Sequence, residues 1–362
     1  MAKKIRVGIM GGGRILAAHA PGFLNEPERC EVVAVAEPRT ERHEAIRALF
    51  KNSQIAFYGD YTELLEKCEV DAVDIILPHD LHMPAAVASA KEKKHVLCEK
   101  VMARNVYECN LMIEAARENG TTLTIAHDRR YHPEWATLKR IVDSGVLGQI
   151  LFWKLEHNQD VLFAENDWVR DRSKIGGGAI MSCLTHQIDA LRWYGGEVCR
   201  VSAMTKTEPS RMEGECIGAV LANMENGALA LLSINWFTQS HTAKNGLWYE
   251  FNHVTGTEGE AYYLSGKGTW LKTRGGNDKI FEYGLDTGGE FAHIKDENAN
   301  SGHVNCISEW LRMLRGEENA VLTYGTDVIK TVEVAEAAYL SEKKGKMIDL
   351  PITPAPWGEE GV

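Results

Sequence analysis

The feature that most constrains the fold is a glycine run that follows the first apolar segment of the chain. Residues 5–10 read IRVGIM, residues 11–13 are all glycine, and RILAAHAPGFL then continues with helical character. Glycine between a buried strand and a helix permits a tight turn and lets the main chain approach a pyrophosphate at the helix N-terminus. Gly8, Gly11 and Gly13 therefore predict the first strand–turn–helix unit of a dinucleotide-binding fold.

Apolar runs alternate with helical segments through the first third of the chain. The runs CEVVAVAEP, VDAVDIILP and KHVLCEK follow IRVGIM, and helical stretches such as residues 40–50 and 83–93 lie between them. Strands that are apolar on both faces and alternate with helices are typical of a parallel sheet covered on both sides. We expect residues 1–127 to form a Rossmann dinucleotide-binding domain.

An acidic residue at the end of the second predicted strand bears on the choice of cofactor. Glu37 lies where a carboxylate binds the ribose hydroxyls of the adenosine, and it would repel a 2′-phosphate. This favours NAD over NADP, although Arg39 close by moderates the preference. Leu16 stands where the usual fingerprint has a small residue, so we expect Ala17 to provide the helix packing instead.

The ends of the next two strands carry polar residues. Ligands of parallel sheets bind at the carboxyl ends of the strands, so we expect Glu99 and Lys100 to face the nicotinamide. The cationic ring of the oxidised cofactor would disfavour the ammonium form of Lys100 and tune it toward proton exchange. His79 and His82 lack a third ligand of evident spacing, so we expect no metal. The predicted cofactor residues are Gly11, Gly13, Arg14, Ile15, Glu37, Pro78, His82, Glu99 and Lys100.

The sequence pattern changes from about residue 128. Apolar and polar residues alternate, as in antiparallel strands with one covered face, in the segments ILFWKLEHNQ, CRVSAMTKT, ECIGAVLANM, GALALLSINWF, WYEFNHVTG and GEAYYLS. Asn226-Gly227 predicts a hairpin between two of them. We expect residues 128–362 to form a second α/β domain with a large, mostly antiparallel open sheet. A helix near residues 178–194 would cover one face, and the other face would pair with a second subunit.

The stretch GGGAIMSCLTHQID combines a second glycine run with a polar stripe on a predicted helix. Ser182, His186 and Asp189 fall on one side of that helix, and apolar residues fall on the other. Two interpretations fit this pattern. The stripe is either a solvated helix face or the lining of a pocket in which His186 acts.

Composition limits the classes of partner and compartment. The formal net charge of −11 argues against nucleic acid or an anionic membrane as a main partner. No apolar run reaches membrane-spanning length, and the N-terminus lacks the pattern of a secretory signal. Eight cysteines without a CxxC pair indicate a reducing compartment, so we expect a cytoplasmic protein.

Several motifs together give the chain a family likeness. VGIMGGGRI followed by His19, then VDAVDIILPHDLH, KHVLCEK, RRYHP, GGGAIMSCLTHQIDALRWYGG and TVEVAEAAYLSEKKGKMIDLP span nearly its whole length. The chain resembles the Gfo/Idh/MocA oxidoreductases. The resemblance implies a Rossmann domain, an open-sheet domain, bound NAD(P), a sugar, glycoside or cyclitol substrate, and a dimer or higher homo-oligomer.

The resemblance also assigns roles to residues and exposes two departures. Lys100 belongs to the family's Glu-Lys-Pro motif, in which Val101 here replaces the proline, and His186 stands where the family's catalytic histidine stands. Ser182 replaces an aspartate that would orient this histidine, and it cannot stabilise an imidazolium by charge. Asp128 is a possible substitute carboxylate.

A mechanistic hypothesis follows from these positions. A secondary ring hydroxyl lies between Lys100 and His186. His186 is the better base and Lys100 the better oxyanion stabiliser. The loop TQSHTAKNGL is long enough to suggest a binding role. Trp236, just before it, is either a binding residue or a core residue. The predicted substrate residues are Asp128, Arg130, Tyr131, His157, Trp168, Arg170, Ser182 and Trp236.

Four functions remain open at the level of the sequence. The leading hypothesis is an NAD-dependent dehydrogenase that oxidises C3 of a glucoside or hexose. An NAD-dependent glycosidase with transient C3 oxidation and an inositol 2-dehydrogenase are the enzymatic alternatives, and the absent aspartate counts against the latter. A cofactor-sensing regulator without turnover is the non-enzymatic alternative, and the presence of both Lys100 and His186 argues against it.

Overall fold

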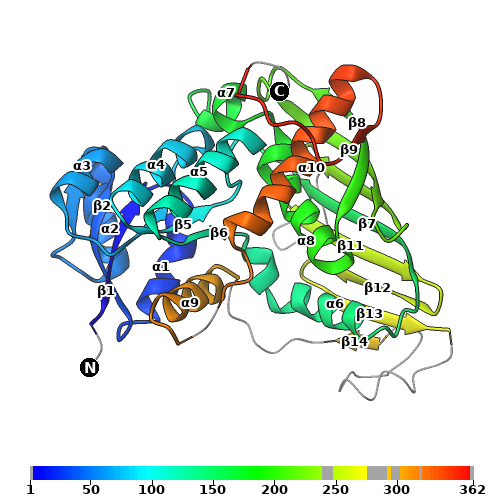
Figure 1. The fold of residues 1–362 in the computed structure, drawn as a ribbon, viewed down its shortest axis with the longest axis horizontal. Coiled ribbons are helices and arrows are strands. Elements are labelled where there is room, and N and C mark those ends of the chain that lie inside the picture. Colours follow the sequence, from blue (N-terminus) through cyan, green and yellow to red (C-terminus); the bar gives the residue numbers. More distant parts are fainter. Residues whose placement is uncertain (1–2, 239–247, 275–291, 295–301, 318–319, 359–362) are drawn as a thin grey trace. The chain divides into compact units, whose positions relative to one another are not determined.

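The computed structural model describes residues 3–238, 248–274, 292–294, 302–317 and 320–358 (Figure 1). The chain divides into two compact units, each of which is built from two segments. The first consists of Met1–Tyr131 and Asn300–Lys330, and the second of His132–Ala299 and Thr331–Val362. Residues 300–330, which the predicted boundary at 127/128 assigns to the second domain, thus belong to the first unit. Most of the loop TQSHTAKNGL, residues 239–247, lies outside the described residues.

The first unit contains the predicted parallel sheet. Its six strands pair in the order β3-β2-β1-β4-β5-β6, and every pair is parallel. The strands are β1 Ile5–Met10, β2 Cys30–Ala36, β3 Ala56–Tyr58, β4 Ala72–Ile75, β5 His95–Glu99 and β6 Leu123–Ala126. The four strands predicted from apolar runs are confirmed. The edge strands β3 and β6 have only three and four residues, too few for a clear period in the sequence.

Helices cover this sheet, and one of them comes from the distant second segment of the unit. The helices are α1 Leu16–Leu24, α2 His43–Phe50, α3 Tyr61–Lys67, α4 His79–Lys91, α5 Val106–Asn119 and α9 Gly302–Leu314. Helix α9 crosses α1 closely, since a Cβ added at Gly22 would lie 2.7 Å from a methyl group of Ile307. The expected packing by Ala17 is wrong, because Leu16 is buried and Ala17 is exposed.

The second unit is built on a nine-stranded sheet. The strand order is β14-β13-β12-β11-β7-β10-β9-β8-β15, in which β7 and β10 are parallel and all other pairs are antiparallel. The strands are β7 Ile150–Gln159, β8 Val198–Thr207, β9 Glu215–Met224, β10 Leu229–Asn235, β11 Trp248–Gly256, β12 Gly259–Leu264, β13 Gly268–Thr273, β14 Ala292–Ile294 and β15 Ile348–Asp349. The predicted hairpin is confirmed, with Gly227 at φ +87° in the turn between β9 and β10.

Helices cover one face of this sheet and leave the other open. Helices α6 Pro133–Asp143, α8 Thr185–Gly195 and the part of α10 Gly325–Lys344 that belongs to this unit lie on the covered side (Figure 1). Contact is close at Gly195, where an added Cβ would meet the ring of Trp153 at 3.0 Å. The shorter helical elements among the described residues are η1 Thr40–Arg42, η2 Asp128–Tyr131, η3 Trp168–Arg170, α7 Arg172–Ile175 and η4 Ile180–Leu184. Among the described residues, no helix is long and apolar enough to cross a membrane.

Candidate functional site

The glycine turn of the first unit leaves its main chain accessible. Gly11 has φ +109°, and a Cβ added there would lie 2.6 Å from the carbonyl oxygen of Ile76, so only glycine fits. A Cβ added at Gly13 would meet nothing within 4 Å. Arg14 and Ile15, which follow it, are exposed. This open main chain directly before α1 has the form that a pyrophosphate requires, so the turn fits a dinucleotide.

Glu37 is joined to the glycine turn and is paired with an arginine. Its Oε2 atom accepts a hydrogen bond from the Gly12 N–H at 3.0 Å, and its two oxygens accept from Nε and Nη2 of Arg39 at 2.7 Å each. Burial would raise the pKa of Glu37, but the hydrogen bonds from Arg39 and Gly12 lower it. The carboxylate therefore lies where the sequence predicts it, but Arg39 offsets the charge that would repel a 2′-phosphate.

The main chain at Lys100 is held by a buried network of carboxylates and imidazoles. The Lys100 N–H donates to Glu99 Oε2 at 3.1 Å, and Glu99 Oε1 lies 3.0 Å from Nε2 of His19. Nδ1 of His19 lies 2.8 Å from Asp74, and His303 of α9 lies 3.4 Å from Glu99. Although burial opposes it, Asp74 and Glu99 raise the pKa of His19 to about 10. The imidazolium and the two carboxylates are therefore mutually stabilised.

The same network contains a set of possible metal ligands that differs from the histidines considered in the sequence. Ligand atoms of His19, Glu99 and His303 lie within 4.8 Å of one another. Burial would raise the pKa of Glu99, but His19 and His303 hold it well below its usual range. Because the protonated imidazole already balances charge here, we propose no metal. The sequence offers no signal for His303, which follows a segment without a recognisable motif.

His82, a predicted cofactor residue, binds main chain instead of projecting from the fold. Its Nδ1 lies 2.7 Å from the carbonyl oxygen of Val101, and its Nε2 lies 2.8 Å from that of Leu77. The His82 ring thus joins the loops that follow β4 and β5. Pro78 directly precedes α4, the helix that contains His82. The peptide between Lys100 and Val101 is cis, although valine occupies the position. A role of His82 or Pro78 toward the cofactor stays a prediction.

Three predicted substrate residues make contacts within the first unit. Arg129 Nη1 donates to Asp128 at 2.7 Å, and Asp128 also lies 3.5 Å from His303. Arg130 forms an ion pair with Asp327 at 2.7 Å and donates to the Leu322 carbonyl at 2.9 Å. The Tyr131 hydroxyl accepts from the Leu322 N–H at 3.0 Å. These contacts give Asp128, Arg130 and Tyr131 a structural role, and their role toward a substrate stays a prediction.

In the second unit, the glycine run before His186 packs around a buried acid and a tyrosine. The N–H groups of Gly178 and Met181 donate to the Tyr339 hydroxyl of α10 at 3.0 and 3.1 Å. The Tyr339 hydroxyl and the Ile180 N–H donate to Glu215 Oε1 at 2.7 and 2.8 Å. A Cβ at Gly178 would lie 2.3 Å from Glu215 Oε2, so glycine is required. Burial raises the pKa of Glu215 to about 7.

The helix that begins at this run is not uniform, and its polar stripe is buried. Ile180–Leu184 forms a π-helical turn, and α8 starts at Thr185. Ser182, His186 and Asp189 are 8%, 6% and 0% exposed, so the solvated-face interpretation is wrong. Asp189 accepts a hydrogen bond from the Thr331 hydroxyl at 3.0 Å, which fixes α8 to α10. The polar residues of this helix therefore differ in role: Asp189 is structural, and His186 faces other partners.

His186 lies in a cluster of buried polar side chains. Its ring is parallel to that of His157 on β7 within 10°, with the ring centroids 6.3 Å apart. Glu250 on β11 is the cross-strand partner of His157, and its Oε1 lies 3.4 Å from His157 Nδ1. Gln187 Nε2 donates to the same Glu250 oxygen at 3.3 Å. Although burial opposes it, contacts with Cys183 and Glu250 raise the pKa of His157 to about 9.

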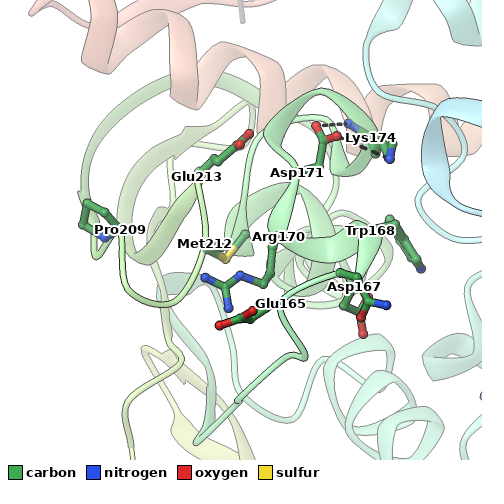
Figure 2. A pocket seen from close by; sticks show the side chains of 10 residues that line it. Glu165, Asp167, Trp168, Arg170, Asp171, Lys174, Pro209, Met212 and Glu213 are labelled. Carbon is green, nitrogen blue, oxygen red and sulfur yellow. Dashed lines mark hydrogen bonds and ion pairs between the residues drawn. The ribbon is translucent and has the colours of Figure 1, made fainter.

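Two predicted substrate residues line a pocket of about 420 Å³ in the second unit (Figure 2). Trp168 and Arg170 contribute side chains, and Arg170 Nη2 also donates to the Ser210 carbonyl at 3.2 Å. The remaining lining residues are Glu165, Asn166, Asp167, Asp171, Lys174, Pro209, Met212 and Glu213. Acidic groups outnumber basic ones in this lining, so the pocket favours a neutral ligand over an anionic one.

Trp236 is a buried residue. Its side chain is 2% exposed, and its ring packs edge-on against Phe163 with the centroids 5.5 Å apart. The indole Nε1 has no hydrogen-bond partner in the described structure. A buried donor without a partner is rare, so a ligand group that reaches it would gain a hydrogen bond. The packing role is therefore shown, and binding stays a prediction.

Glu250 and Gln187 are site residues that the sequence did not single out. Strand alternation in WYEFNHVTG places Glu250, Asn252 and Val254 on one face, and the structure shows all three buried on the covered side. A glutamate on the apolar face of a predicted strand was an available signal, because buried acids require partners. Gln187 carries no such signal, because the local sequence does not distinguish it from its neighbour His186.

The first unit has the form of a dinucleotide-binding domain, and the second presents buried imidazoles and a carboxylate. Residues 5–127 match the oxidoreductase family with an NAD-binding Rossmann fold, and residues 135–262 match the GFO/IDH/MocA C-terminal domain. The chain belongs to the Gfo/Idh/MocA oxidoreductase family, and its first unit is an NAD-binding domain.

Individual relatives cover part of the chain. The levoglucosan dehydrogenase of Pseudarthrobacter phenanthrenivorans is 30% identical over 57% of this chain and 55% of its own length. The inositol 2-dehydrogenase of Salmonella paratyphi B is 32% identical over 53% of this chain and 55% of its own length. The chain thus spans about half the length of these curated relatives. A structure of levoglucosan dehydrogenase with NADH and levoglucosan shares the fold, with a TM-score of 0.84, 20% identity, and coverage of 97% of this chain and 100% of that one.

Proposed function

We propose that this protein oxidises a secondary hydroxyl of a sugar ring, at C3 of a glucoside or hexose, to a ketone. The observation that carries the proposal is the buried pair of parallel imidazoles, His157 and His186, in a chain of an NAD-binding oxidoreductase family. Oxidation of a carbinol needs a group that accepts the hydroxyl proton while the hydride leaves the carbon. Imidazole suits this task near neutral pH. Two relatives named for sugar and cyclitol dehydrogenation support the substrate class.

Residues of the first unit would hold the cofactor. The open main chain at Gly11 and Gly13 would bind the pyrophosphate, and Glu37 the adenosine ribose. Bound NAD supplies the acceptor for the hydride. Lys100 would stabilise the developing alkoxide oxygen as a cation, and His186 would accept its proton. The remaining cofactor residues of the proposal are Arg14, Ile15, Pro78, His82 and Glu99.

The second unit would provide the carbohydrate contacts. Trp168 offers an aromatic face, and Arg170 and the surrounding carboxylates offer hydrogen bonds to hydroxyls. The excess of acidic groups favours a neutral sugar or glycoside. His157, Ser182 and Trp236 are the further binding residues of the proposal.

We also propose that the protein forms a homo-oligomer through the open face of the second sheet. Met204, Leu221 and Leu229 lie on neighbouring strands of that face and are 80%, 58% and 51% exposed. Large exposed apolar groups on one surface are typical of an interface. Leu221→Lys should dissociate the oligomer in size-exclusion chromatography with light scattering, and an unchanged mass would exclude this face. The eight cysteines are thiols in the structure, which supports a reducing compartment such as the cytoplasm.

The proposed activity is tested by incubating the protein and NAD with methyl glucosides, free hexoses and inositols. Mass spectrometry should show the loss of two hydrogens from a glucoside or hexose, together with NADH absorbance. Lys100→Ala should abolish this product. Release of an aglycone without oxidised sugar would instead support the glycosidase alternative. If none of these compounds is changed, the dehydrogenase proposal fails.

A further inference from the structure

The cluster around His186 contains a buried acid that the proposed mechanism does not yet use. Glu250 is 1% exposed and His157 is 3% exposed, and they are direct cross-strand partners on β11 and β7. Ionised carboxylates are not stable in a protein interior without charge or hydrogen-bond partners. The partners of the Glu250 carboxylate include the His157 ring at 3.4 Å and the Gln187 amide at 3.3 Å.

These two partners connect Glu250 to His186, one through the helix and one through the sheet. Gln187 is the next residue to His186 on α8, so its hydrogen bond fixes the first turn of that helix against β11. His157 stacks parallel to the His186 ring on the sheet side. A change at Glu250 would therefore affect both the helix turn that carries His186 and the ring it faces.

We propose that Glu250 is a positioning residue that holds His157 and Gln187 and thereby orients His186 for proton transfer. The inference rests on the proposed function of His186. It also explains how the site works with Ser182 four residues before His186, because the hydroxyl of Ser182 cannot supply a charge. The negative charge comes from the sheet, and it acts on His186 through His157.

Charge distribution in the cluster agrees with this role. The titratable groups around His157 are Glu250 on β11, Cys183 on the π-helical turn and His186 on α8. The pairing with Glu250 favours a protonated His157. The His157 ring lies parallel to that of His186, and a neutral imidazole is the form that can accept a proton.

The sheet offers a matched control. His253 on β11 and Glu260 on β12 form another histidine–glutamate pair, with Nε2 and Oε2 3.0 Å apart, but their side chains are 24% and 38% exposed. Glu260→Gln makes the same chemical change in the same sheet. It lies outside the cluster, so it should leave turnover unchanged.

The test measures kcat and the KM values for NAD and for the glucoside that the protein oxidises, in the variants Glu250→Gln, Glu250→Asp and Glu260→Gln. In Glu250→Gln, kcat should fall by about tenfold or more, with KM for NAD unchanged, because an oriented base contributes in that range. Glu250→Asp should recover part of the loss. The effect of Glu250→Gln should be smaller in a His157→Gln background, since the two residues act together. An additive loss, or a kcat within about twofold of the Glu260→Gln value, would overturn the inference.

A second readout separates this inference from the proposed function. NMR of protein with isotope-labelled histidines gives a titration curve for His157. The resonance of His157 is assigned by its absence from the spectrum of His157→Gln. The midpoint should be lower in Glu250→Gln than in the parent protein, because the stabilising charge is gone. If the parent protein oxidises no sugar, the proposed function fails, and this titration alone decides the pairing. An unchanged midpoint would then overturn it.

Discussion

At the scale of single residues, pairing decides what each charged group can do. Glu37 is in the position that a ribose-binding acid takes, but its two oxygens are occupied by Gly12 and Arg39. His19 is buried completely, yet it is stable as a cation because Asp74 and Glu99 flank it. In both cases the residue type was visible in the sequence. The partner that sets the charge could be seen in the sequence only for Glu37, because Arg39 is two positions away.

The pairing at Glu37 leads to a prediction on cofactor preference. Glu37→Gln removes the negative charge and frees the Arg39 guanidinium to contact a 2′-phosphate. The ratio of kcat/KM for NADP to that for NAD should rise about tenfold or more, which corresponds to about 1.4 kcal/mol. Steady-state kinetics with both cofactors measure it, and Glu41→Gln on the exposed turn nearby is the control. An unchanged ratio would show that Glu37 does not take part in cofactor selection.

At the scale of elements, the helix that carries His186 depends on a buried acid at its start. The Tyr339 hydroxyl accepts hydrogen bonds from the N–H groups of Gly178 and Met181, and Glu215 accepts from the Ile180 N–H and the Tyr339 hydroxyl. The folded-state pKa of Glu215 is raised to about 7 by burial. Its contribution to stability is therefore complete below the unfolded-state pKa of about 4.5 and is lost as the pH rises through about 7.

The direction of the pKa shift at Glu215 leads to a prediction for stability. Between about pH 5 and about pH 8, the parent protein should lose up to about 3 kcal/mol relative to Glu215→Gln, whose side chain does not titrate. Thermal unfolding of both proteins across this range provides the comparison, since other titrating groups are common to both. Parallel pH dependences would mean that Glu215 titrates normally in the folded chain.

Elements were also the level at which the sequence was most informative. Apolar runs and alternation predicted β1, β2, β4, β5 and most strands of the second sheet, because each pattern is local. The π-helical turn at Ile180–Leu184 could not be predicted in this way. It forms against Glu215 and Tyr339, which lie 35 and 159 positions from Ile180. The same reason hid His303, whose contacts with Glu99 and Asp128 join segments far apart in the chain.

At the scale of the whole molecule, the division into units shows the same limit. The sequence pattern changes near residue 128, and the second unit begins at His132. The return of residues 300–330 to the first unit depends on the packing of α9 on α1. Helix amphipathicity alone does not say which core a helix joins.

The central claim is hydride loss from C3 of a sugar ring, and isotope transfer tests it most directly. The protein is incubated with NAD and a methyl glucoside that carries deuterium at C3. The account predicts that deuterium appears on the nicotinamide of the reduced cofactor and that the sugar becomes a 3-ketone. Reduced cofactor without deuterium, formed from the same glucoside, would contradict the assignment of C3.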